Sequence, residues 1–154
     1  MIAPAHDLDR LMALMEASFD PHFREAWTRK QVEDSLVVGN CTYRLVTPEG
    51  EDAGPNDPVA GFSFSRRVID EEELLLIAVS PDHRRKGLAR ILIERLIESA
   101  RENGILRVFL EMRMNNEAET LYRACGFEPI GRRPDYYRTT SGQRLDAITF
   151  ARIV

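Results

Sequence analysis

Cysteine and histidine are scarce in this 154-residue chain, which has two cysteines, Cys41 and Cys125, and three histidines. Two cysteines cannot form the disulfide framework of a small secreted domain. Neither residue type has the spacing of a metal site. We therefore expect a reduced, cytoplasmic setting and no bound metal.

Long hydrophobic runs are also missing. The longest run, LLLIAV at residues 74–79, is far shorter than the roughly 20 residues that a helix needs to cross a bilayer. The opening MIAPAHDLDR lacks the basic and apolar regions of a secretory signal. We expect no membrane partner.

A general excess of positive charge is absent, because 25 acidic residues outnumber 21 basic ones and the net charge is −4. Proteins that bind nucleic acid need surplus cations, so direct nucleic-acid binding is not expected. One local exception is SPDHRRKGLAR at residues 80–90, in which three cations precede a glycine.

The pattern that is present predicts one mixed α/β domain over residues 1–154. Asp7 and Thr28 are candidate N-caps, and Thr28 forms a capping-box pattern with Gln31. The strand at 73–79 is almost continuously apolar, so we expect cover on both of its faces. The next strand follows a helical crossover and should be parallel to it, whereas the two last strands should be antiparallel neighbours. The expected helices are 7–19, 28–38, 87–103 and 116–125, and the expected strands are 41–47, 59–67, 73–79, 105–113, 127–137 and 144–154.

The basic segment at 84–86 stands directly before a helix. A helix start offers unpaired N–H groups and the positive end of the helix dipole, and Gly87 would let an anion approach the backbone. The cations and the glycine alone fit a solvated basic turn as well as an anion site. GxxxxGK[ST] and GxGxxG are both absent, so neither a P-loop nor a dinucleotide fold is indicated.

Several spaced motifs are similar to one family. Arg84-x-x-Gly87-x-Ala89, after LLLIAV, resembles the acyl-CoA pyrophosphate loop of the GNAT family of N-acetyltransferases. LEMRMNNEAETLYRACGF at 110–127 resembles the strand and helix that follow in that family, where the matching positions are Asn115, Ala118, Leu121, Tyr122, Gly126 and Phe127. The resemblance implies a single-domain GNAT fold, with a mostly antiparallel mixed sheet, one splayed parallel strand pair and helices on both faces.

Within the family, ELLLIAVSPDHRRKG, LEMR and RRPDYY are most similar to bacterial enzymes that acetylate the N-terminal alanine of a small-subunit ribosomal protein. This implies acetyl transfer from acetyl-CoA, as cosubstrate, to a terminal amine. Two alternatives remain open: an acetyltransferase for lysine side chains or small amines, and a CoA-binding sensor without catalysis.

The resemblance also implies where acetyl-CoA binds. Either Asn115 or Asn116 would contact CoA: helical phase to Tyr122 favours Asn115, strand phase from Glu111 favours Asn116, and the other would cap the helix. Ile77, Ala78 and Val79 would supply backbone groups for the pantetheine arm, and the diphosphate would be held by Arg84, Arg85, Lys86, Gly87, Leu88, Ala89 and Arg90.

Glu111 is the candidate general base, because it lies mid-strand on the face opposite its apolar neighbours. A weak base is sufficient, since an α-amino group has a pKa of about 8. From the pattern alone, a solvent-facing glutamate is the more common case. Tyr122 is the candidate general acid, although it could simply pack at a helix end. The RRPDYY resemblance implies that Tyr136 and Tyr137 line the substrate cleft, and the alternative is that they fill space between the closing strands. We also expect the acidic stretch 70–73 to steer a basic tail toward the cleft.

Overall fold

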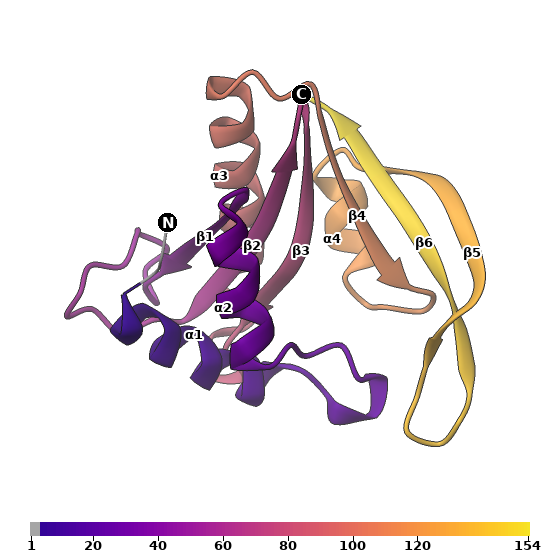
Figure 1. Ribbon diagram of the computed structural model, residues 1–154, viewed down its shortest axis with the longest axis horizontal. Helices are drawn as coiled ribbons and strands as arrows, with labels where there is room; N and C mark the ends of the chain where they lie inside the picture. The colour runs from indigo at the N-terminus through magenta and orange to yellow at the C-terminus, as the bar shows by residue number, and fades with distance from the viewer. Residues whose placement is uncertain (1–3) are drawn as a thin grey trace.

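Six strands form one mixed sheet in the order β1-β2-β3-β4-β6-β5, with α1 and α2 on one face and α3 and α4 on the other (Figure 1). The computed structural model describes residues 4–154, so the first three residues of the expected domain lie outside the described range. The helices are α1 Ala5–Ser18, α2 Arg29–Val38, α3 Leu88–Glu102 and α4 Glu119–Ala124, with short 3-10 turns at Pro21–Phe23 and Pro81–His83. The strands are β1 Cys41–Val46, β2 Gly61–Val68, β3 Glu71–Val79, β4 Arg107–Arg113, β5 Glu128–Arg138 and β6 Arg144–Ile153.

The parallel pair β3–β4 is the feature that opens the sheet. Its pairing runs from Glu71 opposite Arg107 to Leu74 opposite Leu110, and then stops. Beyond that point the two strands diverge, so that the sheet becomes V-shaped (Figure 1). The parallel β3–β4 pairing, the antiparallel β5–β6 pairing and the fold class predicted from the sequence are all confirmed.

A β-bulge in β3 explains its long apolar run. Phe64 of β2 pairs with Leu76 and Ser65 pairs with Leu74, which leaves Leu75 as the extra residue. The side chain of Leu74 joins the core beneath α3, whereas that of Leu76 joins the core beneath α1 and α2. The expectation of cover on both faces is correct only in part, because Leu75 and Ile77 remain partly exposed.

The helix caps follow the sequence signals at α2 but not at α1. Thr28 and Gln31 form the predicted capping box, with backbone-to-side-chain distances of 3.2 and 2.7 Å. The prediction of Asp7 as an N-cap is wrong, since α1 begins at Ala5. The Asp7 carboxylate instead accepts hydrogen bonds from the Tyr43 hydroxyl and from Arg10.

α3 packs its apolar stripe against the sheet as the sequence predicts. Its buried side chains recur at helical spacing, and they are Leu88, Leu92, Ile93, Leu96, Ile97 and Ala100. α4 is shorter than expected, because residues 116–118 form a turn before it and Gly126, at φ 87°, ends the segment. No helix of residues 4–154 is long and apolar enough to cross a membrane.

Candidate active site

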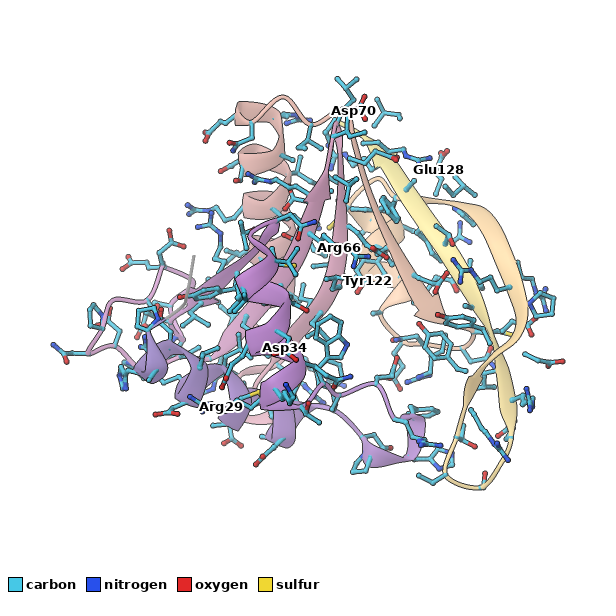
Figure 2. All side chains as sticks on the ribbon, viewed as in Figure 1. Arg29, Asp34, Arg66, Asp70, Tyr122 and Glu128 are labelled. Atoms are coloured by element: carbon cyan, nitrogen blue, oxygen red, sulfur yellow. The ribbon has the colours of Figure 1, made fainter. Side chains whose placement is uncertain are left out.

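A cavity of about 760 Å³ lies where β3 and β4 separate. Figure 2 shows Tyr122 beside this gap. The walls come from β3, β4, the turn before α4, Tyr122 of α4, Tyr137 of β5 and the loop between α1 and α2. The cavity therefore gathers several of the predicted site residues, namely Ile77, Arg84, Glu111, Asn115, Asn116, Tyr122 and Tyr137.

Glu111 lies in β4 with its side chain toward this cavity. Its neighbours Leu110 and Met112 are buried in the core, as the alternation of a strand requires. The Glu111 side chain is 18% exposed and pairs through Oε2 with the Arg133 guanidinium at 3.2 Å. The Arg133 side chain is 61% exposed and can leave this position at small cost.

Tyr122 is buried, and its ring packs edge-on against Phe127 with centroids 6.1 Å apart. Burial raises the pKa of its phenol, and the nearby negative charge of Glu25 raises it further. The phenol therefore carries its proton throughout the neutral range. A hydroxyl in this state can donate a proton to a strongly basic group that forms beside it.

The basic loop enters α3 with the geometry of an anion site. Gly87 precedes the helix at φ 77°, and a Cβ at this position would have no atom within 4 Å, so the space around it is open. No side chain of residues 4–154 caps the α3 N-terminus, which leaves the first-turn amides available. Arg85, Lys86 and Arg90 are exposed, whereas Leu88 anchors the helix in the core and Ala89 is partly exposed.

Arg84 is exposed like the other cations of this loop, but its guanidinium is held by two backbone carbonyls. It donates to the Ser18 carbonyl at 3.1 Å and to the Val79 carbonyl at 3.4 Å, joining the ends of α1 and β3. Of the predicted pantetheine positions, Ile77 lines the cavity, while the Ala78 side chain belongs to the core beneath α1 and α2. Within the described part of the chain, no strand pairs with residues 75–79 of β3 on the β4 side.

Asn115 and Asn116 both line the cavity but have different local roles. The Asn116 side chain accepts a hydrogen bond from the Ala118 N–H at 2.9 Å and so caps the turn into α4. Asn115 has a φ of 67° and is exposed. The cap position at Asn116 leaves Asn115 as the better candidate for a CoA contact.

The two adjacent tyrosines of β5 are placed differently. Tyr137 lines the cavity, and burial raises the pKa of its phenol, with smaller contributions from the charges of Glu111 and Glu25. Tyr136 is 52% exposed and does not line the cavity. Its ring instead lies under the Arg133 guanidinium, 5.0 Å from the ring centroid.

The acidic stretch 70–73 does not face the cleft, so the expectation that it steers a substrate is wrong. Asp70 lies at the closed end of the β3–β4 pair (Figure 2). Glu71 and Glu73 are paired with Arg107 and Arg66, and Glu72 is fully buried. These acids are neutralised within the fold.

Sequence reasoning missed the contribution of the loop between α1 and α2. Glu25 in this loop lines the cavity and pairs with Arg113 of β4 at 3.3 Å, while the Arg113 guanidinium lies 3.5 Å from the Phe23 ring centroid. The same loop reaches the β5–β6 hairpin: the Thr140 N–H donates to the His22 carbonyl at 2.9 Å, and His22 Nδ1 lies 2.9 Å from Thr140 Oγ1. An irregular loop has no periodicity, so the residue pattern of this segment gave no signal that it would reach the cavity.

Comparison with known proteins agrees with this geometry. The model of the acetyltransferase (GNAT) family matches residues 8–127. The chain belongs to this family. It is 42% identical over 97 residues to the [ribosomal protein bS18]-alanine N-acetyltransferase of Escherichia coli (strain K12), a match that covers 62% of this chain and 65% of that relative's length. The crystal structure of the Escherichia coli ribosomal-protein-S18-alanine N-acetyltransferase superposes with a TM-score of 0.81 at 29% identity, covering 100% of this chain and 92% of that one.

A second solved structure extends the comparison of the fold. Arabidopsis thaliana NAA60 in complex with acetyl-CoA gives a TM-score of 0.78 at 20% identity, covering 99% of this chain and 96% of that one. Among residues 4–154 no group of three or more His, Cys, Asp or Glu side chains is arranged to hold a metal ion.

Proposed function

We propose that this protein transfers the acetyl group of acetyl-CoA to the N-terminal α-amino group of a protein, with the N-terminal alanine of a ribosomal protein such as bS18 as acceptor. The observation that carries the proposal is the cavity at the β3–β4 divergence, which holds a carboxylate, Glu111, and a protonated phenol, Tyr122, on the chain of a GNAT family member. Family membership and the similarity to the bS18-alanine acetyltransferases support the reaction class. Newly made ribosomal proteins are found in the cytoplasm, which is therefore the proposed location.

Acetyl-CoA would lie across the open end of the sheet. Its diphosphate would be held by the amides of residues 85–90 at the start of α3, with Arg85 and Lys86 neutralising charge. The amide-rich pantetheine arm would run along the unpaired side of β3 from Ile77 to Val79, in the manner of an added strand. Asn115 would hold the same arm from the turn before α4.

The chemistry then needs three proton transfers. Glu111 accepts a proton from the acceptor's ammonium group, directly or through water, after Arg133 moves aside. The neutral nitrogen attacks the thioester carbonyl carbon, and the Val79 N–H is available to stabilise the negative charge on its oxygen. As the C–S bond breaks, Tyr122 gives its proton to the departing thiolate. The attacking nitrogen, positively charged once the C–N bond has formed, loses its second proton, which restores the Tyr122 phenol, and Glu111 releases the first proton to solvent.

A chain end suits this cavity better than a lysine in the middle of a chain. The hydrogen bonds between His22 and Thr140 join the α1–α2 loop to the β5–β6 hairpin across the acceptor side. A terminal amine can be threaded beneath such a bridge, whereas an internal lysine needs an open groove on both sides. The terminal amine also has the lower pKa, by roughly two units, so a much larger fraction is neutral near pH 7.

The deciding experiment compares two peptides by mass spectrometry. One carries the free N-terminus of bS18, and the other has the same sequence with a blocked N-terminus and free lysines. We expect the unblocked peptide to be acetylated about a hundredfold faster, in keeping with the two-unit difference in amine pKa. Equal rates would contradict the N-terminal acceptor and favour the lysine alternative, and acetyl-CoA binding without acetylation of either peptide would favour a sensor.

A further inference from the structure

Two carboxylates from different parts of the chain meet in the acceptor region. Glu111 comes from β4, and Glu25 comes from the loop between α1 and α2. Both line the same cavity, and the charges of both act on the Tyr137 phenol. The charge of Glu25 also acts on Tyr122. The two carboxylates therefore lie around the place where the acceptor nitrogen must be activated.

Each of these carboxylates is incompletely bonded. Glu25 receives one hydrogen bond, from Arg113 Nε to Oε1 at a long 3.3 Å, and its side chain is 20% exposed. Its Oε2 has no hydrogen-bond partner among the described residues, and neither has Oε1 of Glu111. One carboxylate oxygen from each wall is thus available to a ligand.

Burial makes the Glu25 oxygen a strong site for a cation. Desolvation raises the pKa of Glu25, although the charge of Arg113 works in the opposite direction. A carboxylate that has lost water and keeps only one long hydrogen bond gains from a second cationic donor. An ammonium group, with three N–H donors, can bridge two such oxygens, whereas an amide N–H cannot supply the charge.

We propose that Glu25 binds the ammonium group of the acceptor, together with the open oxygen of Glu111, and that this contact selects a free amine. The assignment rests on the proposed function, because it requires an amine acceptor. Glu25 holds the nitrogen, Glu111 takes the proton, and the neutral amine is left between the two walls. Arg113, stacked on Phe23, holds the Glu25 carboxylate at Oε1 and leaves Oε2 without a protein partner among the described residues.

Calorimetric titration of acceptor peptides into the CoA-loaded protein tests this role without turnover. The wild-type protein should bind a free-amine peptide more tightly than the same peptide with an acetylated N-terminus. Glu25→Gln should weaken binding of the free-amine peptide about 10- to 100-fold, the worth of a hydrogen bond to a charged group, and leave binding of the acetylated peptide and of CoA unchanged. Glu25→Asp should recover part of the loss, and the surface variant Glu16→Gln should match the wild type.

A second variant separates ligand binding from loop structure. Arg113→Lys weakens the anchor of Glu25 but keeps a cation beside it, so we expect the preference for the free amine to remain. A purely structural ion pair would instead make Glu25→Gln and Arg113→Lys lose affinity for both peptides alike. That result, or unchanged free-amine binding by Glu25→Gln, overturns the assignment.

The titration also distinguishes failure of this inference from failure of the proposed function. If the wild-type protein acetylates a lysine or a small amine instead of a chain end, the acceptor is wrong, yet the same comparison with that amine and its acetylated form still tests Glu25. If the terminal amine is acetylated and Glu25→Gln behaves as the wild type, only the role of Glu25 falls. A protein that acetylates no amine overturns both.

Discussion

At the closed end of the β3–β4 pair, the Glu72 carboxylate is fully buried and both of its oxygens are bonded, by the Ser65 hydroxyl at 2.5 Å and by Arg67 at 2.8 Å. At the splayed end, Glu25 and Glu111 are partly exposed, and each shares one oxygen with one arginine. A buried carboxylate with both oxygens bonded within the chain belongs to the structure of the fold and offers no free oxygen to a ligand. A half-bonded carboxylate in a cavity keeps binding capacity for a ligand.

The Arg67 side chain extends the saturated network, since it also donates to the Ser99 hydroxyl at 2.9 Å and thereby joins β2 to α3. The Arg113 and Arg133 side chains at the open end lie instead on aromatic rings, those of Phe23 and Tyr136. The comparison thus predicts opposite consequences for the same Glu→Gln substitution at the two ends. We expect loss of activity at the open end and loss of stability at the closed end.

The largest effect is expected for Glu111→Gln. Loss of the general base should lower kcat/KM about 1,000-fold at pH 7, within the range that proton transfer contributes. The rate should recover in part at higher pH, where the amine loses its proton unaided. Its free energy of unfolding should stay within about 1 kcal/mol of the wild type, because the replaced group is a partly exposed ion pair. Steady-state kinetics from pH 6 to 9.5 provide the measurement, and a loss that is constant with pH would argue against the base role.

Glu72→Gln should show the reverse pattern. Breaking a buried charged pair leaves Arg67 without its partner, so the free energy of unfolding should fall by about 3 kcal/mol. Turnover of the fraction that remains folded should be close to that of the wild type, since Glu72 lies at the closed end of the strand pair. Urea denaturation and kinetics at 15 °C measure the two quantities separately. A stable but inactive Glu72→Gln protein would remove the distinction between the two ends.

A smaller effect should separate the two adjacent asparagines. Asn115→Ala should weaken acetyl-CoA binding about tenfold, the worth of one hydrogen bond to the cosubstrate. Asn116→Ala should cost about 1 kcal/mol of stability through the lost cap and change acetyl-CoA affinity less. Calorimetry and thermal unfolding of both variants test this order. The reverse order of affinities would assign the CoA contact to Asn116.

Local signals in the sequence predict the elements well, whereas long-range partners decide the details. The Thr28–Gln31 capping box is a local pattern and forms as predicted. Asp7 carries an equally clear local signal, but Tyr43, 36 residues away, takes its carboxylate. The bulge at Leu75 could not be predicted, because a continuous apolar run reads the same whether or not one residue is unpaired.

The same limit applies to the site. The spaced motifs predicted Glu111, Tyr122 and the loop before α3 as parts of the site. In the structure, Glu111 and Tyr122 line one cavity. Glu25 lies in an irregular loop, and only the folded chain shows that it is desolvated beside Arg113. The acidic stretch suggests a steering surface when only the sequence is read, but the arginines that pair with Glu71, Glu72 and Glu73 come from β2 and β4.

The smallest effect concerns the alkaline limit of stability. Burial raises the pKa of Tyr122 in the folded protein, whereas in the unfolded chain tyrosine titrates near 10. The neutral phenol's contribution to folding is therefore fully present below pH 10 and is lost above it, as the unfolded chain releases its proton first. At pH 10.5 one such tyrosine should lower the free energy of unfolding by about 0.8 kcal/mol relative to pH 7.5. Tyr122→Phe should reduce this fall in the free energy of unfolding by the same amount, as measured by urea denaturation. The contributions of Tyr43 and Tyr137 to the fall should be unchanged. Equal falls in the variant and the wild type would mean that the Tyr122 phenol ionises as readily in the cavity as in water, which would contradict the effect of burial on its pKa.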